Sequence, residues 1–230
     1  MGRTVKLTIA LALATSLGAC SYLKDARDYV VDSVSESDEK SMAHGHMHHV
    51  SKAWKDTPGG KGLLPTAMAE AKTALTHAKL ASKKGADLKT MKMHTVHVLH
   101  AVDPSVEKKG PGLGYGVLKA TRGVVKHIGL AASAKSASKN IKTHAVHVAS
   151  AAKNTVTRAE KIVFYGRRVL KAKTAAMAKP WVANIANLAK QLGKGVDANG
   201  DKKISWHDGE GGLAAAKKHM GFMMKGEKMM

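Results

Sequence analysis

The sequence predicts an all-α protein: an antiparallel helical bundle made from two copies of one helical hairpin, followed by a short helix–loop–helix unit. Three observations lead to this fold class. Apolar residues recur at helical spacing over long stretches that end at glycine or proline. No segment shows the sustained alternation of a half-buried strand. Finally, a 25-residue segment reappears fifty positions further along the chain.

The helices are bounded by residues that stop or start helical structure. Gly85 is expected to end the first helix of the bundle, and Pro104 lies just beyond the second. Pro180 is expected to end the long fourth helix. These breakers and the apolar pattern place the predicted helices at about 65–84, 88–102, 117–134, 139–178, 181–194 and 212–224.

The repeated segment carries histidines at equivalent positions. When residues 77–101 are laid over 127–151 without a gap, ten of the 25 positions are identical, and three of these are histidines. The unit is a hairpin with the pattern H-x16-H-x2-H, in repeats of about 66–103 and 116–153. Because a helix rises about 1.5 Å per residue, its three histidines lie at similar distances from the turn. We therefore predict two equivalent trios, which are His77, His94 and His97, and His127, His144 and His147. The sequence leaves open whether the two hairpins form two sites or share one.

Each trio has three imidazoles, and no carboxylate is present in both repeats. This limits the kinds of metal or cofactor that a trio could bind. Di-iron sites of helical bundles need inward glutamates, and Glu70 is replaced by Ala120 in the second repeat. A neutral three-imidazole site suits copper or zinc. Alternatively, two histidines from facing helices are the axial ligands of a b-type haem for electron transfer. A further alternative gives these histidines no ligand and makes the chain a structural adaptor.

Histidine and methionine also cluster near both ends of the helical region. Thioether and imidazole groups suit copper, and such mixed segments resemble those of exported copper-handling proteins. Copper is therefore the favoured transition metal, with storage, buffering or delivery as the expected function. The auxiliary ligands expected here are His44, His46, Met47, His48 and His49 at one end, and His219, Met220, Met223 and Met224 at the other.

The first twenty residues have the features of an export signal. Arg3 and Lys6 precede an apolar stretch, 7–17, that is too short for a permanent membrane span. The following "LGAC" resembles the lipobox of bacterial lipoproteins. The resemblance implies cleavage before Cys20, lipidation of this cysteine and, because Ser21 follows it, a position on the periplasmic side of the outer membrane. Cys20 is the only cysteine, so neither a disulfide nor a catalytic thiolate is expected.

A further motif, "DANGDKKISWHD" at residues 197–208, lies between two predicted helices. It resembles the calcium-binding loop of EF-hand proteins, with two departures: Lys202 replaces a glycine, and Asp208 replaces the usual glutamate. The resemblance implies that Ca²⁺ is bound by Asp197, Asn199, Asp201, the carbonyl of Lys203, Ser205 and Asp208.

The formal net charge of +21 points to an anionic partner. An exported protein meets little nucleic acid, and only 4% of the residues are aromatic, which leaves few rings for base stacking. The expected partners are therefore the membrane, through the lipid anchor, and either anionic lipid or an acidic periplasmic protein. No arrangement of nucleophile and base is visible, so an enzyme is not expected.

The chain is thus expected to have four parts. A signal peptide occupies residues 1–19, and a tether with the His/Met-rich segment occupies 20–57. The duplicated bundle is expected at 58–180. The EF-hand-like unit with its Met-rich tail is expected at 181–230.

Overall fold

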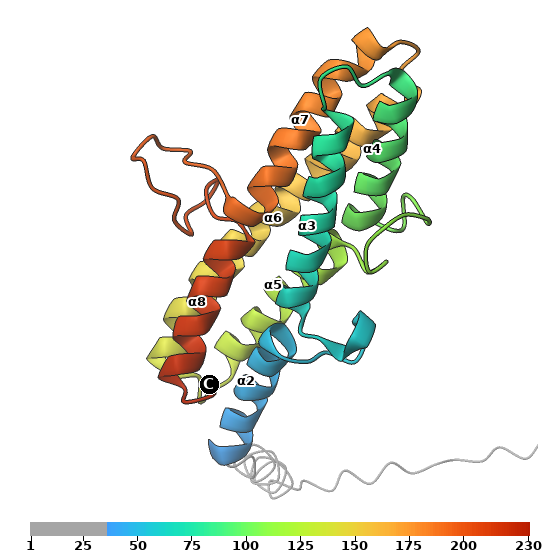
Figure 1. The fold of residues 1–230 in the computed structure, drawn as a ribbon. Helices are drawn as coiled ribbons and strands as arrows, with labels where there is room; N and C mark the ends of the chain where they lie inside the picture. Colours follow the sequence, from blue (N-terminus) through green and yellow to red (C-terminus); the bar gives the residue numbers. More distant parts are fainter. Residues whose placement is uncertain (1–35) are drawn as a thin grey trace, which may run out of the picture. The chain divides into compact units, whose positions relative to one another are not determined.

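The computed structural model describes residues 36–230, and it confirms the all-α prediction for this range (Figure 1). Residues 1–35, with the predicted signal peptide and Cys20, lie outside the described residues. The described part has a short 3₁₀ helix at Pro58–Gly60 and one isolated bridge between Ala53 and Lys61. Its α-helices are α2 (Glu36–Ser51), α3 (Leu63–Ala81), α4 (Leu88–Val102), α5 (Val117–Ser133), α6 (Lys139–Lys171), α7 (Ala175–Lys194) and α8 (Leu213–Gly226).

The long helix α6 is the common packing partner of the bundle. It contacts α4, α5, α7 and α8. Helices α3 and α4 form one antiparallel hairpin, and α5 and α6 form the other, as the repeat predicted (Figure 1). Residues 39–230 make one compact unit. The predicted bundle and the predicted C-terminal unit therefore pack together.

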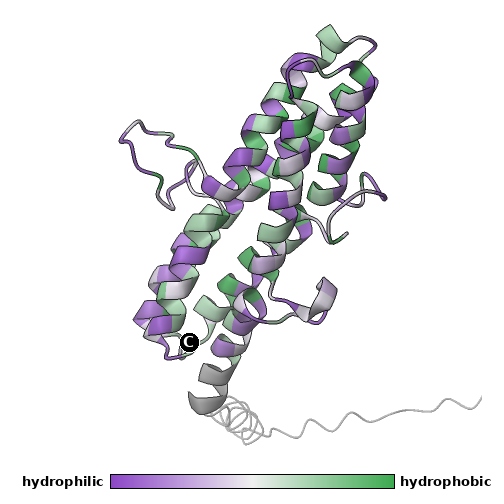
Figure 2. Ribbon diagram, in the orientation of Figure 1, coloured by the Kyte–Doolittle hydropathy of each residue, from purple (hydrophilic) through white to green (hydrophobic). Residues whose placement is uncertain are grey.

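The core follows from the amphipathic pattern of the helices. Many of the buried residues are alanines. Larger side chains such as Leu63, Ile128 and Ile162 fill the space between them. Small residues allow helices to approach closely. Figure 2 shows hydrophobic and hydrophilic residues mixed along each helix and mainly hydrophilic loops. No helix in residues 36–230 has both the length and the apolarity needed to cross a bilayer.

Side-chain caps define where several helices begin. Asp87 accepts a hydrogen bond from the Thr90 N–H at the start of α4, and Ser138 accepts one from Ile141 at the start of α6. Thr174 caps α7 in the same way. The predicted helix end at Pro180 is wrong, because the break falls at 172–174 and Pro180 lies inside α7. At Pro180 the helix lacks the one hydrogen bond that an N–H would donate to the carbonyl four residues earlier.

A buried carboxylate anchors the loop between α4 and α5. Glu70 on α3 is fully buried, and its oxygens accept hydrogen bonds from the backbone N–H groups of Leu113, Tyr115 and Gly116 at 2.9–3.1 Å. Gly112 approaches this carboxylate so closely that a Cβ there would lie 2.5 Å from an oxygen. The glycine-rich loop therefore wraps around a negative charge.

A second buried charge holds the loop between α7 and α8. The guanidinium of Arg158 on α6 donates to the carbonyls of Gly209, Glu210 and Gly211 at 2.6–2.7 Å. Asn154, one turn earlier, exchanges hydrogen bonds with the backbone of His207 and Gly209. The loop at 195–212 is thus fixed to α6, beside the histidines of this helix.

Candidate metal centres

Nine of the thirteen histidines meet in three trios in the described part of the chain. In each trio, one ligating nitrogen from every ring lies within 4.8 Å of the others. Each combines two histidines three residues apart on one helix with a single histidine from another helix. We name them site 1 (His77, His94, His97), site 2 (His46, His49, His127) and site 3 (His144, His147, His219).

Site 1 lies within the α3–α4 hairpin, as predicted. The Nδ1 atom of His77 on α3 is 3.1 Å from that of His94 and 3.3 Å from that of His97, both on α4. Burial, followed by the charges of His97 and His94, lowers the pKa of His77. Burial also lowers the pKa of His94. The lowered pKa values favour the neutral form of His77 and His94, which is the form that binds metals.

Site 2 joins α2 to α5. The Nδ1 atoms of His46 and His127 are 3.1 Å apart, and the His49 ring centroid is 5.0 Å from that of His127. The indole of Trp54 contacts the rings of His49 and His127, with centroids at 4.6 and 4.7 Å. Burial lowers the pKa of His127 to about 4. The Nδ1 atom of His49 is buried without a hydrogen-bond partner, which is uncommon for a ring nitrogen.

Site 3 joins α6 to α8. Nδ1 of His219 on α8 lies 3.2 Å from Nδ1 of both His144 and His147 on α6. Trp206, from the loop that Arg158 and Asn154 fix, stacks on His147 with centroids 4.0 Å apart and planes 24° apart. Burial lowers the pKa of His219 to about 4.

The predicted second trio is wrong, because His127 does not meet His144 and His147. His127 faces α2 and belongs to site 2, whereas His144 and His147 face α8 and belong to site 3. The repeat identified histidines that lie in trios, but it could not identify the helices that bring the other histidines to them. A signal for site 2 was present, since His46 and His49 have the same H-x2-H spacing as the pairs on α4 and α6.

The residues predicted as auxiliary ligands divide between the trios and other environments. The predicted tether is helical from Glu36 to Ser51, and this helix brings His46 and His49 to site 2. His219 belongs to site 3. His48 is exposed, and His44 contacts the carboxylate of Glu227 at 3.3 Å.

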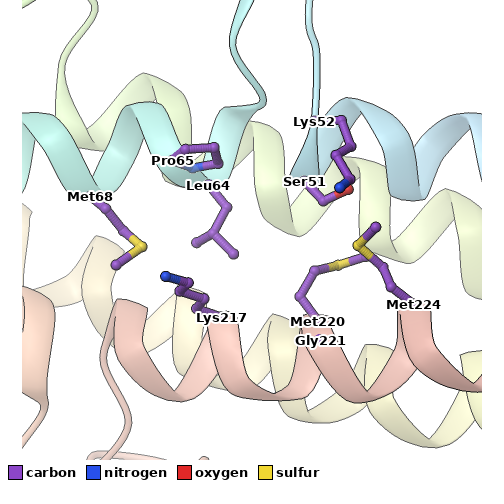
Figure 3. Close-up of a pocket in the computed structure, with 9 residues that line it drawn as sticks. All are labelled: Ser51, Lys52, Leu64, Pro65, Met68, Lys217, Met220, Gly221 and Met224. Atoms are coloured by element: carbon purple, nitrogen blue, oxygen red, sulfur yellow. The ribbon is translucent and has the colours of Figure 1, made fainter. Parts of the chain in front are cut away.

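The predicted methionine ligands are buried in the core. Met47, Met220, Met223 and Met224 are at most 6% exposed. Met220 and Met224 also line a pocket of about 330 Å³ between α8, the start of α3 and the end of α2, together with Met68 (Figure 3). Their burial is the arrangement of a methionine-rich core stripe.

The EF-hand-like loop keeps part of the expected backbone geometry. Lys202, which replaces the usual glycine, has a positive φ of 66°. Asp197 accepts hydrogen bonds from the N–H groups of Gly200 and Lys202. Within the described residues, however, the carboxylates of Asp197, Asp201 and Asp208 do not converge as the histidines do. Ser205 donates instead to Glu210, which is buried. Calcium binding by Asp197, Asn199, Asp201, Lys203, Ser205 and Asp208 stays a prediction.

The nitrogen separations in the trios fit a single small ion. Two nitrogens at 2.0–2.1 Å from one tetrahedral ion are about 3.3 Å apart, and the close Nδ1 pairs measure 3.1–3.3 Å. In site 1 and site 3, one Nδ1 faces two others. A neutral imidazole nitrogen has either one proton or one lone pair and cannot form two good hydrogen bonds there. An ion at the centre would engage all three lone pairs together.

No protein-family model matches the chain, and no curated protein or solved structure shows significant similarity to it. The function is therefore inferred from the geometry of the sites.

Proposed function

We propose that this chain binds transition-metal ions at site 1, site 2 and site 3, one ion at each, and that it stores, buffers or delivers them. The observation that carries the proposal is the convergence of three imidazole nitrogens at each site, with close pairs at 3.1–3.3 Å. The same ligand set occurs three times on different pairs of helices. The buried Nδ1 of His49, which has no hydrogen-bond partner, would also be satisfied by a bound ion.

A single ion fits these sites better than haem. Bis-histidine ligation needs two imidazoles on opposite faces of a macrocycle. In each trio, by contrast, the rings contact one another, as for His77 and His97, whose centroids are 4.6 Å apart. A porphyrin has no space between such rings.

Among suitable ions, Cu²⁺ is expected to bind most tightly, because nitrogen sites follow the Irving–Williams order. Zn²⁺ is the next candidate, since a three-histidine set suits its tetrahedral geometry. This argument for copper does not need the buried methionines. It rests on imidazole alone.

Three protein ligands favour exchange over a permanent structural role. Structural zinc sites are usually closed by four protein ligands, whereas three leave a position open for water or an incoming ligand. Most of the trio histidines are also partly exposed. An incoming chelating group therefore has a position from which to remove the ion. With the predicted lipobox, these sites would lie at the outer membrane.

Metal stoichiometry tests the proposal. The untagged full chain is stripped with a chelator, titrated separately with Cu²⁺ and Zn²⁺, and measured by calorimetry and elemental analysis. We expect about three ions per chain. His77→Ala, His127→Ala and His219→Ala should each remove one ion, because each deletes the single histidine of one trio. His48→Ala, at an exposed histidine outside the trios, is the matched control and should retain three.

Equal binding by all four variants and the unaltered chain would contradict the proposal. A Soret band in the protein isolated from its native compartment would favour haem ligation instead. Binding of Ca²⁺ alone would leave the structural-adaptor alternative.

A further inference from the structure

One end of the bundle carries a dense positive charge. The α3–α4 turn and the α6–α7 turn lie together at this end (Figure 1). From residue 161 to 179, across the second of these turns, the chain has six lysines and arginines and no aspartate or glutamate. All six basic side chains are exposed. Such a concentration attracts polyanionic surfaces at long range.

Aromatic side chains lie among these charges. Phe164 on α6 is 50% exposed, and the guanidinium carbon of Arg168 lies 3.8 Å from the centre of its ring. Arg168 is also 5.4 Å from the ring centre of Trp181 on α7, which stacks with Tyr165. Stacking restrains a guanidinium while leaving its N–H donors free for oxyanions.

The basic residues beside Phe164 have no negative partner. Val163, Phe164, Arg167, Arg168 and Lys171 line a depression of about 310 Å³. The one acid at its edge, Glu160, is paired with Arg122 at 2.8 Å. No ion pair between described residues involves Arg167, Arg168 or Lys171. Their charge is therefore available to a partner.

Exposed apolar side chains among unpaired cations fit the interface of a lipid bilayer. Apolar groups enter the headgroup region, and lysine and arginine contact the phosphates. Met177, at the start of α7, is 53% exposed and is, after Phe164, a second exposed apolar side chain in this part of the bundle. We propose that this end of the bundle, defined by Phe164, Arg167, Arg168, Lys171 and Met177, docks on an anionic phospholipid surface.

Vesicle binding tests this inference independently of metal binding. The full chain is mixed with vesicles of phosphatidylcholine alone or with added phosphatidylglycerol, and partitioning is measured by sedimentation. Binding to the neutral vesicles measures any contribution from the apolar N-terminal segment. The added affinity for the anionic vesicles measures docking that depends on the anionic lipid. Arg167→Ala with Arg168→Ala should lower this added affinity about fivefold per residue, and Phe164→Ser should lower it further.

A matched pair controls for net charge. Lys108→Ala with Lys109→Ala removes two exposed charges from the α4–α5 loop and should leave the added affinity within about twofold of the unaltered value. Unchanged helical circular dichroism and metal stoichiometry show that each variant is folded. An equal loss in both pairs would show that net charge alone drives binding, and the proposed surface would be wrong.

A local probe identifies the surface that enters the bilayer. In the chain with Trp54→Phe and Trp206→Phe, Trp181 is the only tryptophan left. Its emission should shift to the blue with anionic vesicles and be quenched by brominated lipid. No shift, or binding that inorganic phosphate fully competes away, would overturn docking on a bilayer and indicate another partner or a soluble anion.

Discussion

The α3–α4 hairpin completes a histidine trio by itself, whereas the α5–α6 hairpin divides its three equivalent histidines between two sites. In the first hairpin, His77 faces His94 and His97 across the helix pair. In the second, His127 faces the histidines of α2, and His144 and His147 face the histidine of α8. The three histidines are thus present in both repeats, while the neighbouring helices determine which histidines meet.

The two turns differ in a way that accompanies this change. The first contains Gly85 at a φ of 84°, whereas the second has no described residue with positive φ. Helix α5 ends at Ser133, two residues beyond the equivalent of Ala81, where α3 ends. The cap of the following helix also moves by one position, from Asp87 to Ser138. The turn between α5 and α6 is therefore one residue shorter than the turn between α3 and α4.

The difference between the two hairpins is tested most directly by a double variant in the second hairpin. His127→Ala with His144→Ala should remove two of three bound ions, because these histidines belong to site 2 and site 3. His77→Ala with His94→Ala should remove only one, since both belong to site 1. Elemental analysis after equilibrium dialysis counts the ions. If each double variant lost one ion, the second hairpin would hold a trio like the first.

The hairpins also differ at Glu70, whose equivalent in the second is Ala120. Glu70→Ala should lower the free energy of unfolding by about 3–5 kcal/mol, because three backbone N–H groups lose a buried carboxylate. Urea denaturation of the metal-free protein measures the loss. In the second hairpin, Glu160→Ala breaks an exposed ion pair with Arg122 and should cost less than about 1 kcal/mol. Equal losses would contradict the anchoring role of Glu70.

Low pH should destabilise the metal-free protein through His127 of site 2 and His219 of site 3. Burial lowers the pKa of His127 and of His219 from 6.5 to about 4. Between these values the unfolded chain binds more protons, so stability is full above pH 6.5 and falls as the pH drops towards 4. His127→Gln should flatten this fall in urea denaturation, whereas exposed His48→Gln should not. A pH profile unchanged by His127→Gln would show that this histidine titrates normally.

The helices and the trio within the first hairpin could be predicted from the sequence because both are local properties. Helical periodicity and capping residues give the elements, and the repeat identifies His77, His94 and His97 as neighbours within one hairpin. Site 2 and site 3 depend on contacts between residues 72 to 81 positions apart. Such contacts are decided by how α2 and α8 pack, and spacing within a repeat does not encode that packing. The role of Glu70 was missed for the same reason.

The smallest expected difference concerns the indoles, which flank site 2 and site 3 but, among the described ring contacts, not site 1. A metal-bound imidazole carries positive charge, and an indole face stabilises a nearby cation by about 0.5–1 kcal/mol at exposed sites. Trp206→Leu should therefore weaken binding at site 3 by about two- to fivefold and leave site 1 unchanged. Chelator competition on chains that retain a single trio measures each affinity. Trp181→Leu, whose ring stacks on Tyr165, is the control. An unchanged site 3 in Trp206→Leu would mean that the indole packs beside the metal centre without strengthening it.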